Sequence, residues 1–163
     1  MIRIAIVEDD KNYIHTLKKL LDQYEEDSGH KLLLTIFEDG EDIAVNYKAE
    51  YDIILMDIEM RFMDGMTAAT KIREKDHEVV LIFITNMPQY VMEGYKVDAL
   101  DYVLKPLTYF ALSQRIDRAI SRMKKRTSKF ITLTLPNGLQ KVDINHISYI
   151  EVQNHDVIFL YPD

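Results

Sequence analysis

Side chains that can bind a metal ion or handle a phosphoryl group stand at the ends of four apolar runs. These residues are the acidic pair Glu8 and Asp9, then Asp57, Thr85 and Lys105. Carboxylates, a hydroxyl and an ammonium form a set suited to binding Mg²⁺ and to phosphoryl transfer. The set can act only if folding brings these four parts of the chain to one place.

The carboxylates of this set favour a hard divalent cation. Carboxylates held close together repel, which raises the pKa of at least one of them, and a divalent cation relieves the repulsion. Mg²⁺ prefers oxygen ligands, keeps several waters and uses few carboxylates. We expect Asp9 and Asp57 to be direct ligands of Mg²⁺ and Glu8 to act through water. A backbone carbonyl near Glu59 can complete the ligand shell.

The same residues provide a nucleophile and the charges that phosphoryl transfer needs. An ionised Asp57 is an adequate nucleophile and would form an acyl phosphate. The Lys105 ammonium, together with Mg²⁺, can neutralise phosphoryl oxygens, and the Thr85 hydroxyl can donate to another. An acyl phosphate is labile, so this chemistry predicts a reversible phosphoacceptor rather than a turnover enzyme.

Each of these residues also has an ordinary structural interpretation when it is taken alone. Asp10, before a predicted helix, is better interpreted as a helix N-cap than as a ligand. A threonine that ends a strand is most often a β-former, and a single lysine is most often solvated. The joint placement at four strand ends supports the functional interpretation. Several methionines are interpreted as core and loop packing, namely Met56, Met60, Met63 and Met66.

The apolar periodicity predicts five alternating strands and helices that would position these side chains. Strands are expected at about 2–7, 32–37, 52–56, 79–84 and 102–104. Helices are expected at about 10–25, 41–48, 65–73, after Pro88, and at about 107–123. This alternation predicts an α/β fold with a doubly wound, five-stranded parallel sheet. Ligands of such sheets bind beyond the carboxyl ends of the strands.

Composition is that of an ordinary globular chain of 163 residues, with 47% apolar and 29% charged side chains. Cysteine is absent, which excludes disulfides and thiolate metal sites. No apolar run approaches the length needed to span a bilayer. The N-terminal apolar run is short and soon acidic, unlike a signal peptide. We therefore expect a cytoplasmic protein without a membrane partner.

The last part of the chain differs from the rest in charge and pattern. Residues 123–163 hold five basic and four acidic side chains, whereas residues 1–122 have a net charge of −8. An acidic body repels nucleic acid, so any DNA contact should lie in the C-terminal part. Strands are expected at 130–135 and 139–144 around a hairpin turn, and at 148–152 and 157–161. These patterns predict a short all-β segment.

The residues at the strand ends resemble the response regulator receiver family. The matching stretches are residues 4–10, 54–58, 63–65, 83–85 and 101–106, in the order and spacing of that family. The resemblance implies a flavodoxin-like (CheY-like) sheet of order 2-1-3-4-5 and a phosphoryl group taken from a sensor histidine kinase. It also implies a switch in which Thr85 moves toward the phosphoryl group and Tyr102 rotates inward. The Lys105–Pro106 bond is a candidate cis peptide.

Two positions depart from the pattern of that family. Arg61 stands in a loop where the family usually has proline, and Asn86 stands where it usually has a small residue. Asn86 and Glu59 flank the expected phosphoryl site. The two departures therefore bear on how fast phosphate is lost.

The C-terminal segment resembles the beginning of a LytTR-type DNA-binding domain. The resemblance rests on residues 130–133, the turn at 137–138 and residues 144–151. It divides the chain into a receiver domain (1–122), a linker (123–129) and the N-terminal fragment of a LytTR-type domain (130–163). We expect promoter DNA to be bound only by an intact protein, and Asn154 and His155 mainly to form a turn. Unpaired strand edges within 130–161 predict a homodimer.

Two other functions compete with a phosphoacceptor switch. One is a phosphohydrolase of the haloacid dehalogenase type, whose two-acid motif Asp57 and Glu59 imitate. That motif normally follows the first strand and has aspartate as its second acid. The other is a partner-binding module without phosphorylation, against which the complete set of Asp9, Asp57, Thr85 and Lys105 argues.

Overall fold

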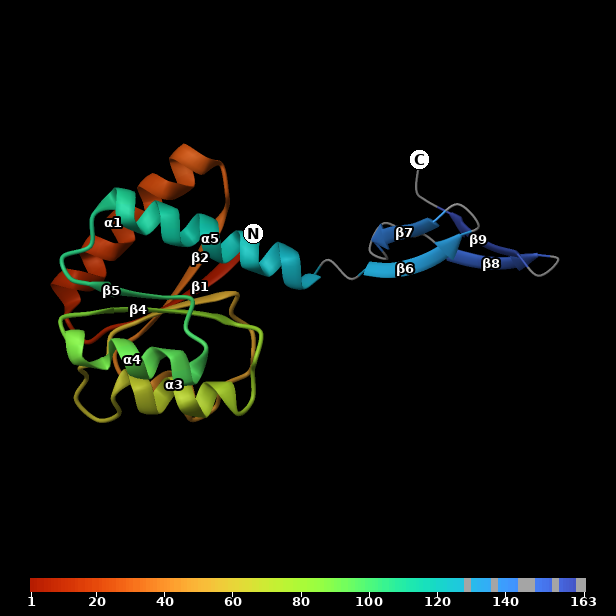
Figure 1. Cartoon of the computed structure of the whole chain (residues 1–163). Helices are drawn as coiled ribbons and strands as arrows, with labels where there is room; N and C mark the ends of the chain where they lie inside the picture. Colours follow the sequence, from red (N-terminus) through yellow and green to blue (C-terminus); the bar gives the residue numbers. More distant parts are fainter. Residues whose placement is uncertain (128–129, 136–137, 144–148, 154–155, 161–163) are drawn as a thin grey trace. The chain divides into compact units, whose positions relative to one another are not determined.

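The computed structural model contains two compact units, Met1–Ile120 and Ser121–Asp163 (Figure 1). The structure describes residues 1–127, 130–135, 138–143, 149–153 and 156–160. The first unit holds a parallel sheet with helices on both faces, which confirms the predicted α/β class. The second unit holds two strand pairs.

The sheet of the first unit has five parallel strands in the order β2-β1-β3-β4-β5, as predicted. The strands are β1 (Ile2–Val7), β2 (Leu32–Phe37), β3 (Ile53–Met56), β4 (Val80–Thr85) and β5 (Asp101–Leu104). Met56 pairs with Val7 on one side and with Phe83 on the other. Thr85 pairs with Leu104. The carboxyl ends of four neighbouring strands therefore meet at one edge.

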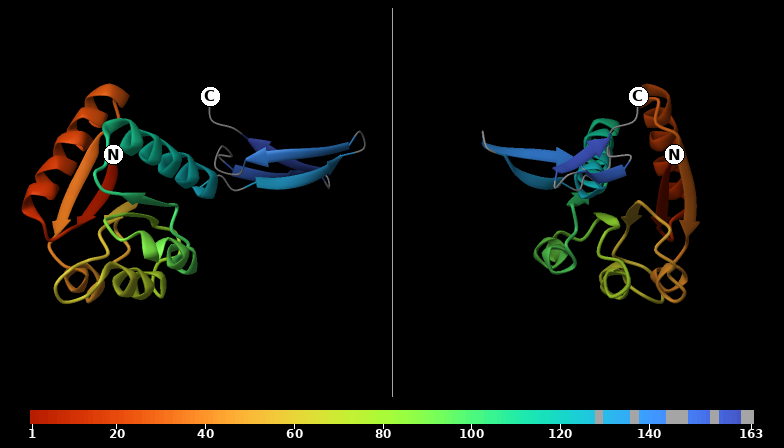
Figure 2. Two further views of the ribbon diagram at one scale, coloured as in Figure 1. Left: turned by 60° about the vertical axis from the view of Figure 1, so that its left-hand side comes forward. Right: turned by 90° about the vertical axis from the view of Figure 1, so that its right-hand side faces the viewer.

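The helices lie in two layers (Figure 2). They are α1 (Lys11–Ser28), α2 (Gly40–Ala44), α3 (Gly65–Arg73), α4 (Val91–Gly94) and α5 (Tyr109–Thr127), with 3₁₀ turns η1 (Pro88–Tyr90) and η2 (Tyr95–Val97) around α4. Helices α1 and α5 cover one face of the sheet, and α3 and α4 cover the other. This arrangement buries both faces of the parallel sheet.

Strand residues alternate between the two layers because side chains of a strand point to opposite faces. Ala5 and Val7 pack in one cluster with Ala68 and Ile72 of α3. Ile2, Ile4 and Ile6 alternate with these residues and point toward the opposite layer, where they are also buried. Apolar runs without polar alternation are thus explained by burial on both faces.

Local capping fixes the ends of α1. The Asp10 carboxylate accepts hydrogen bonds from the backbone N–H groups of Asn12 and Tyr13, at 2.8 and 3.3 Å, which confirms its N-cap role. Gly29 ends the helix with φ of 72°. The helix therefore runs three residues past the predicted end at residue 25.

Two other helices differ from the predicted spans, and the helix expected after Pro88 is present but short. Helix α2 ends at Ala44 instead of residue 48, and Ala49 has a left-handed φ of 53°. Helix α4 is a single turn, and the chain leaves η2 at Asp98 with φ of 48°. Helix α5 begins at Tyr109 instead of residue 107, because the Thr108 hydroxyl accepts a hydrogen bond from the N–H of Ala111.

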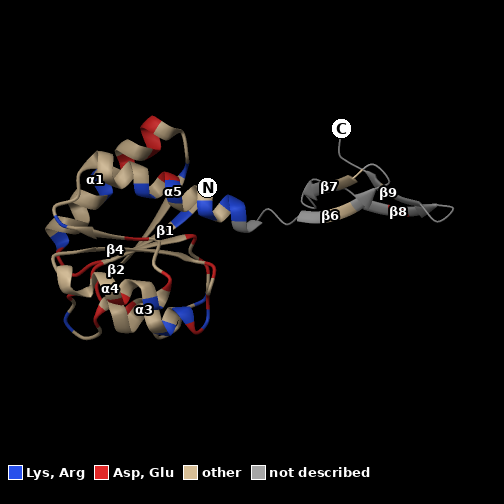
Figure 3. Ribbon diagram, viewed as in Figure 1, with Lys and Arg blue, Asp and Glu red and all other residues tan. Residues whose placement is uncertain are grey.

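The second unit confirms the predicted all-β pattern. Strands β6 (Phe130–Leu135) and β7 (Gly138–Asp143) pair antiparallel, as do β8 (Tyr149–Gln153) and β9 (Asp156–Leu160). Helix α5 continues to Thr127, through most of the span predicted as a linker, and its last turns are basic (blue in Figure 3). Cations at a helix C-terminus favour this extension. The predicted turn residues Asn154 and His155 lie outside the described residues.

Candidate functional site

Backbone hydrogen bonds between neighbouring strands set the edge at which the predicted site residues meet. The N–H of Glu8 donates to the Phe37 carbonyl at 3.0 Å, and the N–H of Asp57 donates to the Val7 carbonyl at 2.9 Å. The N–H of Lys105 donates to the Thr85 carbonyl at 2.9 Å. Each residue is thus held one step beyond its strand.

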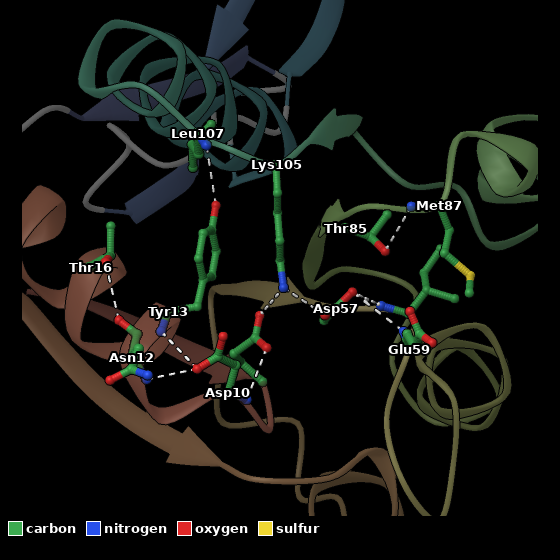
Figure 4. Close-up of polar contacts among 12 residues, drawn as sticks. Asp10, Asn12, Tyr13, Thr16, Asp57, Glu59, Thr85, Met87, Lys105 and Leu107 are labelled. Atoms are coloured by element: carbon green, nitrogen blue, oxygen red, sulfur yellow. Dashed lines mark hydrogen bonds and ion pairs between the residues drawn. The ribbon is translucent and has the colours of Figure 1, made fainter.

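Lys105 joins two buried carboxylates at this edge (Figure 4). Its Nζ lies 2.7 Å from Glu8 Oε2 and 2.7 Å from Asp57 Oδ2. The three side chains are 10%, 2% and 7% exposed, respectively. The structure therefore brings together three of the predicted residues, with one positive charge facing two negative charges.

The pKa values of this trio reflect that imbalance. Burial raises the pKa of Glu8, and the neighbouring Asp57 raises it further, which outweighs the opposing effect of Lys105. Burial lowers the pKa of Lys105, but hydrogen bonds to Asp57 and Glu8 more than offset it and leave that pKa raised. The site thus holds more negative charge than its own ammonium neutralises, which fits a bound divalent cation.

The Asp57 carboxylate has a fixed orientation. Its Oδ1 accepts a hydrogen bond from the N–H of Ile58 at 2.6 Å and a longer one from Glu59 at 3.4 Å. The first residue of α3, Gly65, approaches closely: a Cβ there would lie 2.0 Å from the Asp57 carbonyl oxygen. Only glycine allows α3 to begin this close to the residue after β3.

Thr85 and Tyr102 are connected through the backbone of Met87. The buried Thr85 hydroxyl accepts a hydrogen bond from the Met87 N–H at 3.3 Å. The Tyr102 hydroxyl donates to the Met87 carbonyl, and its ring packs at a tilt on Phe83, with 6.0 Å between centroids. The two predicted switch residues therefore share one loop residue, a link that the sequence does not reveal.

Two predicted metal-site residues lie outside the ion-paired trio. Asp9 is exposed and lines a separate hollow of about 400 Å³ beside Arg61 and Phe62. Glu59 is exposed and contacts Asp57 through its backbone. Within the described part of the chain, no three acidic or histidine side chains are grouped so that they could hold a metal ion. The four-residue ligand set of the sequence analysis is not preassembled and stays a prediction.

The two positions that depart from the receiver family pattern, Arg61 and Asn86, are both exposed. The Arg61 guanidinium lies over the Phe62 ring, 5.0 Å from its centroid. The loop is held by the buried Asp39 carboxylate, which accepts from the N–H groups of Phe62 and Met63 at 2.8 and 3.0 Å.

The Lys105–Pro106 bond is cis, as predicted.

The sequence does not single out one residue beside the site, Tyr13. In the first turn of α1, Tyr13 is half-buried, whereas its neighbour Ile14 is buried. The Tyr13 ring centroid lies 4.3 Å from Lys105 Nζ. The sequence signal that could have indicated this contact is the position of Tyr13 in the first helical turn after the acidic pair Glu8 and Asp9.

Comparison with known proteins identifies the family. The family model described as the response regulator receiver domain matches residues 4–117. The chain belongs to this family, the receiver modules of two-component signalling. The match does not favour the alternative of a haloacid dehalogenase-type phosphohydrolase. The position of Asp57 also disagrees with that alternative, because Asp57 follows the third strand, β3, and the dehalogenase motif normally follows the first.

Similar proteins of known name agree with this assignment. The chain is 32% identical to the transcriptional regulatory protein RprY of Bacteroides fragilis, over 78% of this chain and 53% of that protein. It is 30% identical to the sensory transduction protein LytT of Oceanobacillus iheyensis, over 91% and 62%. The chain thus spans less than two thirds of the length of these curated relatives.

Solved structures confirm the fold. The response regulator TrrA of Thermotoga maritima, in complex with Mg²⁺-BeF, is 26% identical and aligns with a TM-score of 0.64 over 73% of this chain and 99% of that one. The BeF3-activated receiver domain of DrrB is 27% identical, with a TM-score of 0.64 over 74% and 98%. None of the helices in the described residues combines the length and the apolar character of a membrane span.

Proposed function

We propose that Asp57 accepts a phosphoryl group from a sensor histidine kinase in a Mg²⁺-dependent reaction. The observation that carries this proposal is the buried trio in which Lys105 Nζ lies 2.7 Å from both Glu8 and Asp57. The proposal is supported by membership of the receiver family and by a structural relative solved with Mg²⁺-BeF.

In this reaction Asp57 acts as the nucleophile. One carboxylate oxygen attacks phosphorus, the bond from phosphorus to the donor nitrogen breaks, and an acyl phosphate forms. The Lys105 ammonium pairs with a phosphoryl oxygen and the Thr85 hydroxyl donates to another. The protein acts as a phosphoacceptor switch, not as a turnover enzyme, and we place this exchange in the cytoplasm.

The carboxylates of Glu8, Asp9 and Asp57 would hold Mg²⁺, with the backbone near Glu59. When bound, Mg²⁺ supplies positive charge that neutralises the carboxylates and the phosphoryl oxygens. Glu8 and Asp57 fit this role because both are buried and share a single ammonium. Asp9 would join them from the adjacent exposed position.

We further propose that phosphorylation is transmitted through Thr85, the Met87 backbone and Tyr102. A threonine that turns toward the phosphoryl group releases the Met87 N–H, and Tyr102, whose hydroxyl donates to the Met87 carbonyl, then rotates inward behind Thr85. Both contacts start from one loop residue. The surface around β5 would change as a result.

The output is proposed to be control of transcription through a LytTR-type domain of which residues 130–163 form the first part. This proposal is supported by the two antiparallel strand pairs, β6 with β7 and β8 with β9, and by an alignment to LytT that covers 91% of this chain. Promoter DNA is the proposed ligand of this output. A homodimer through residues 130–161 would pair the strand edges.

Incubation with acetyl phosphate and Mg²⁺, followed by intact mass measurement, tests the phosphoacceptor proposal. The protein should gain one phosphoryl group, and chelation of Mg²⁺ should prevent the gain. Asp57→Asn should gain none, whereas the matched variant Asp52→Asn, at the opposite end of β3, should gain one. Equal gains in both variants would refute Asp57 as the acceptor.

A further inference from the structure

Lys105 has a third neighbour that is neither an acid nor part of the phosphoryl chemistry. The Tyr13 ring, in the first turn of α1, lies with its centroid 4.3 Å from Lys105 Nζ (Figure 4). An ammonium at this distance from an aromatic face is attracted by the ring quadrupole. The attraction is stronger when the ammonium is shielded from water, and Lys105 is 10% exposed.

The Tyr13 hydroxyl also contacts the chain on the far side of Lys105. It accepts a hydrogen bond from the Leu107 N–H at 3.2 Å. On the near side, the Lys105 N–H is bonded to the Thr85 carbonyl of β4. Tyr13 itself is fixed because its N–H donates to the Asp10 carboxylate. The first turn of α1 thus connects the acidic end of β1 to both the ammonium and the backbone of the segment after β5.

The ring differs from the two carboxylates in what the reaction does to it. Phosphorylation converts the Asp57 carboxylate to an acyl phosphate, and a bound cation competes with the ammonium for Glu8. Both 2.7 Å ion pairs of Lys105 therefore change during the reaction. The tyrosine ring is neutral and takes no part in either change, so its contact with the ammonium can persist.

We propose that Tyr13 is a positioning residue that holds the Lys105 ammonium in place while the carboxylates exchange partners. The proposal rests on the proposed phosphoacceptor function and adds a residue to its machinery. The ring positions the ammonium, and the hydroxyl positions the backbone that follows it. A purely structural role would instead make Tyr13 a packing residue between α1 and the segment after β5.

The contact can be measured in the metal-free protein without any phosphorylation. A tyrosine ring this close shifts the proton resonances of the Lys105 ε-methylene upfield through its ring current. Tyr13→Leu should return these resonances toward the values of a solvated lysine, whereas Tyr13→Phe should keep the shift. Resonances that do not move in Tyr13→Leu would overturn the proposed contact.

The rate of phosphorylation by acetyl phosphate, at saturating Mg²⁺, measures the functional effect. Tyr13→Phe loses one hydrogen bond and should slow the reaction by less than about tenfold. Tyr13→Leu also loses the ring and should be slower than Tyr13→Phe by a further factor of roughly two to thirty. Tyr24→Phe, which removes a hydroxyl elsewhere on α1, should react at the wild-type rate.

A double-mutant cycle separates positioning from packing. In a Lys105→Met background, Tyr13→Leu and Tyr13→Phe should react at the same rate, because no ammonium remains to be held. The positioning role would be overturned if Tyr13→Leu and Tyr13→Phe reacted at equal rates with Lys105 present. It would also be overturned if their rates differed by the same factor in the Lys105→Met background as with Lys105 present. Wild-type protein that gains no phosphoryl group would overturn the proposed function and this role with it, so the two failures are distinguishable.

Discussion

The two ends of strands β1 and β3 carry ion pairs of opposite character. At the amino end, the Arg3 guanidinium donates to both oxygens of Asp52, at 3.2 and 2.9 Å, and the side chains are 46% and 21% exposed. At the carboxyl end, Lys105 is shared between Glu8 and Asp57, and all three are nearly buried. The first pair is balanced in charge and solvated, whereas the second set is buried with excess negative charge.

This difference separates structure from chemistry within one sheet. The solvated pair of Arg3 and Asp52 joins the starts of two strands, and its charges are balanced without a further ion. A buried set with one unmatched negative charge is less stable by itself and is improved by a cation. The same two strands therefore offer a matched control for each test of the site.

The largest expected effect follows from removal of the shared ammonium. Lys105→Met leaves Glu8 and Asp57 buried side by side, and should lower the free energy of unfolding of the metal-free protein by about 3 kcal/mol or more. Mg²⁺ should recover part of this loss. Urea unfolding with and without Mg²⁺ measures both effects. A variant as stable as wild type would contradict the buried trio.

The second effect is stabilisation by Mg²⁺ itself. A ligand that binds only the folded state, present at a hundred times its Kd, stabilises by about 2.7 kcal/mol. Thermal unfolding of wild type should shift upward with Mg²⁺ and level off at saturation. Asp57→Asn should lose most of this shift, and Asp52→Asn should keep it. A shift of equal size in both variants would place the cation elsewhere.

Arg3→Ala should have a smaller effect at the amino end of the strands. Its loss removes a largely solvated pair and should cost about 1 kcal/mol or less. The rate of phosphorylation should not change, since the pair is separated from the site by the length of β1. Chemical denaturation and the acetyl phosphate assay test the two parts. A large loss of phosphorylation in Arg3→Ala would contradict the claim that the amino ends of the strands take no part in the chemistry.

The smallest effect is a pH dependence of opposite sign at the two ends. The pKa of Glu8 is raised, first by burial and then by Asp57, so its ionised form costs stability above that pKa. Burial raises the pKa of Asp52, but Arg3 more than offsets it and lowers that pKa. Asp52 therefore contributes stability above the ordinary pKa of aspartate, and this is lost as pH falls through its lowered value.

Two variants measure these opposite contributions in the metal-free protein. Glu8→Gln should be more stable than wild type at neutral pH, and the gain should shrink as pH falls. Asp52→Asn should be less stable at neutral pH, and this deficit should also shrink in acid. Urea unfolding at a series of pH values between 7 and about 4 gives both curves. Curves of the same sign would show that the two ends are electrostatically alike.

Much of the fold could be predicted because buried parallel strands are continuous apolar runs. The predicted span of α3 was confirmed at both ends, and Asp10 was confirmed as an N-cap. Helix α2 was predicted to reach residue 48 but ends at Ala44, because apolar spacing does not show that Ala49 adopts a left-handed φ angle. Helix α5 passed through the predicted linker because a basic run is also a favourable helix end.

The site could be predicted in part, because the ends of parallel strands converge. Glu8, Asp57 and Lys105 meet as expected. Contacts that come from loops could not be predicted, such as the Met87 backbone between Thr85 and Tyr102. The ring of Tyr13 was also missed, because half-burial beside an ammonium and burial in a core give the same apolar spacing.

The most direct test of the central claim is to locate the phosphoryl group on the chain. Reduction of an acyl phosphate with borohydride converts the modified aspartate to homoserine, which peptide mass spectrometry detects at a single position. After reaction with acetyl phosphate and Mg²⁺, the account predicts homoserine at position 57 and at no other aspartate. Homoserine at another aspartate, or none at all in protein that is folded and supplied with Mg²⁺, would contradict it.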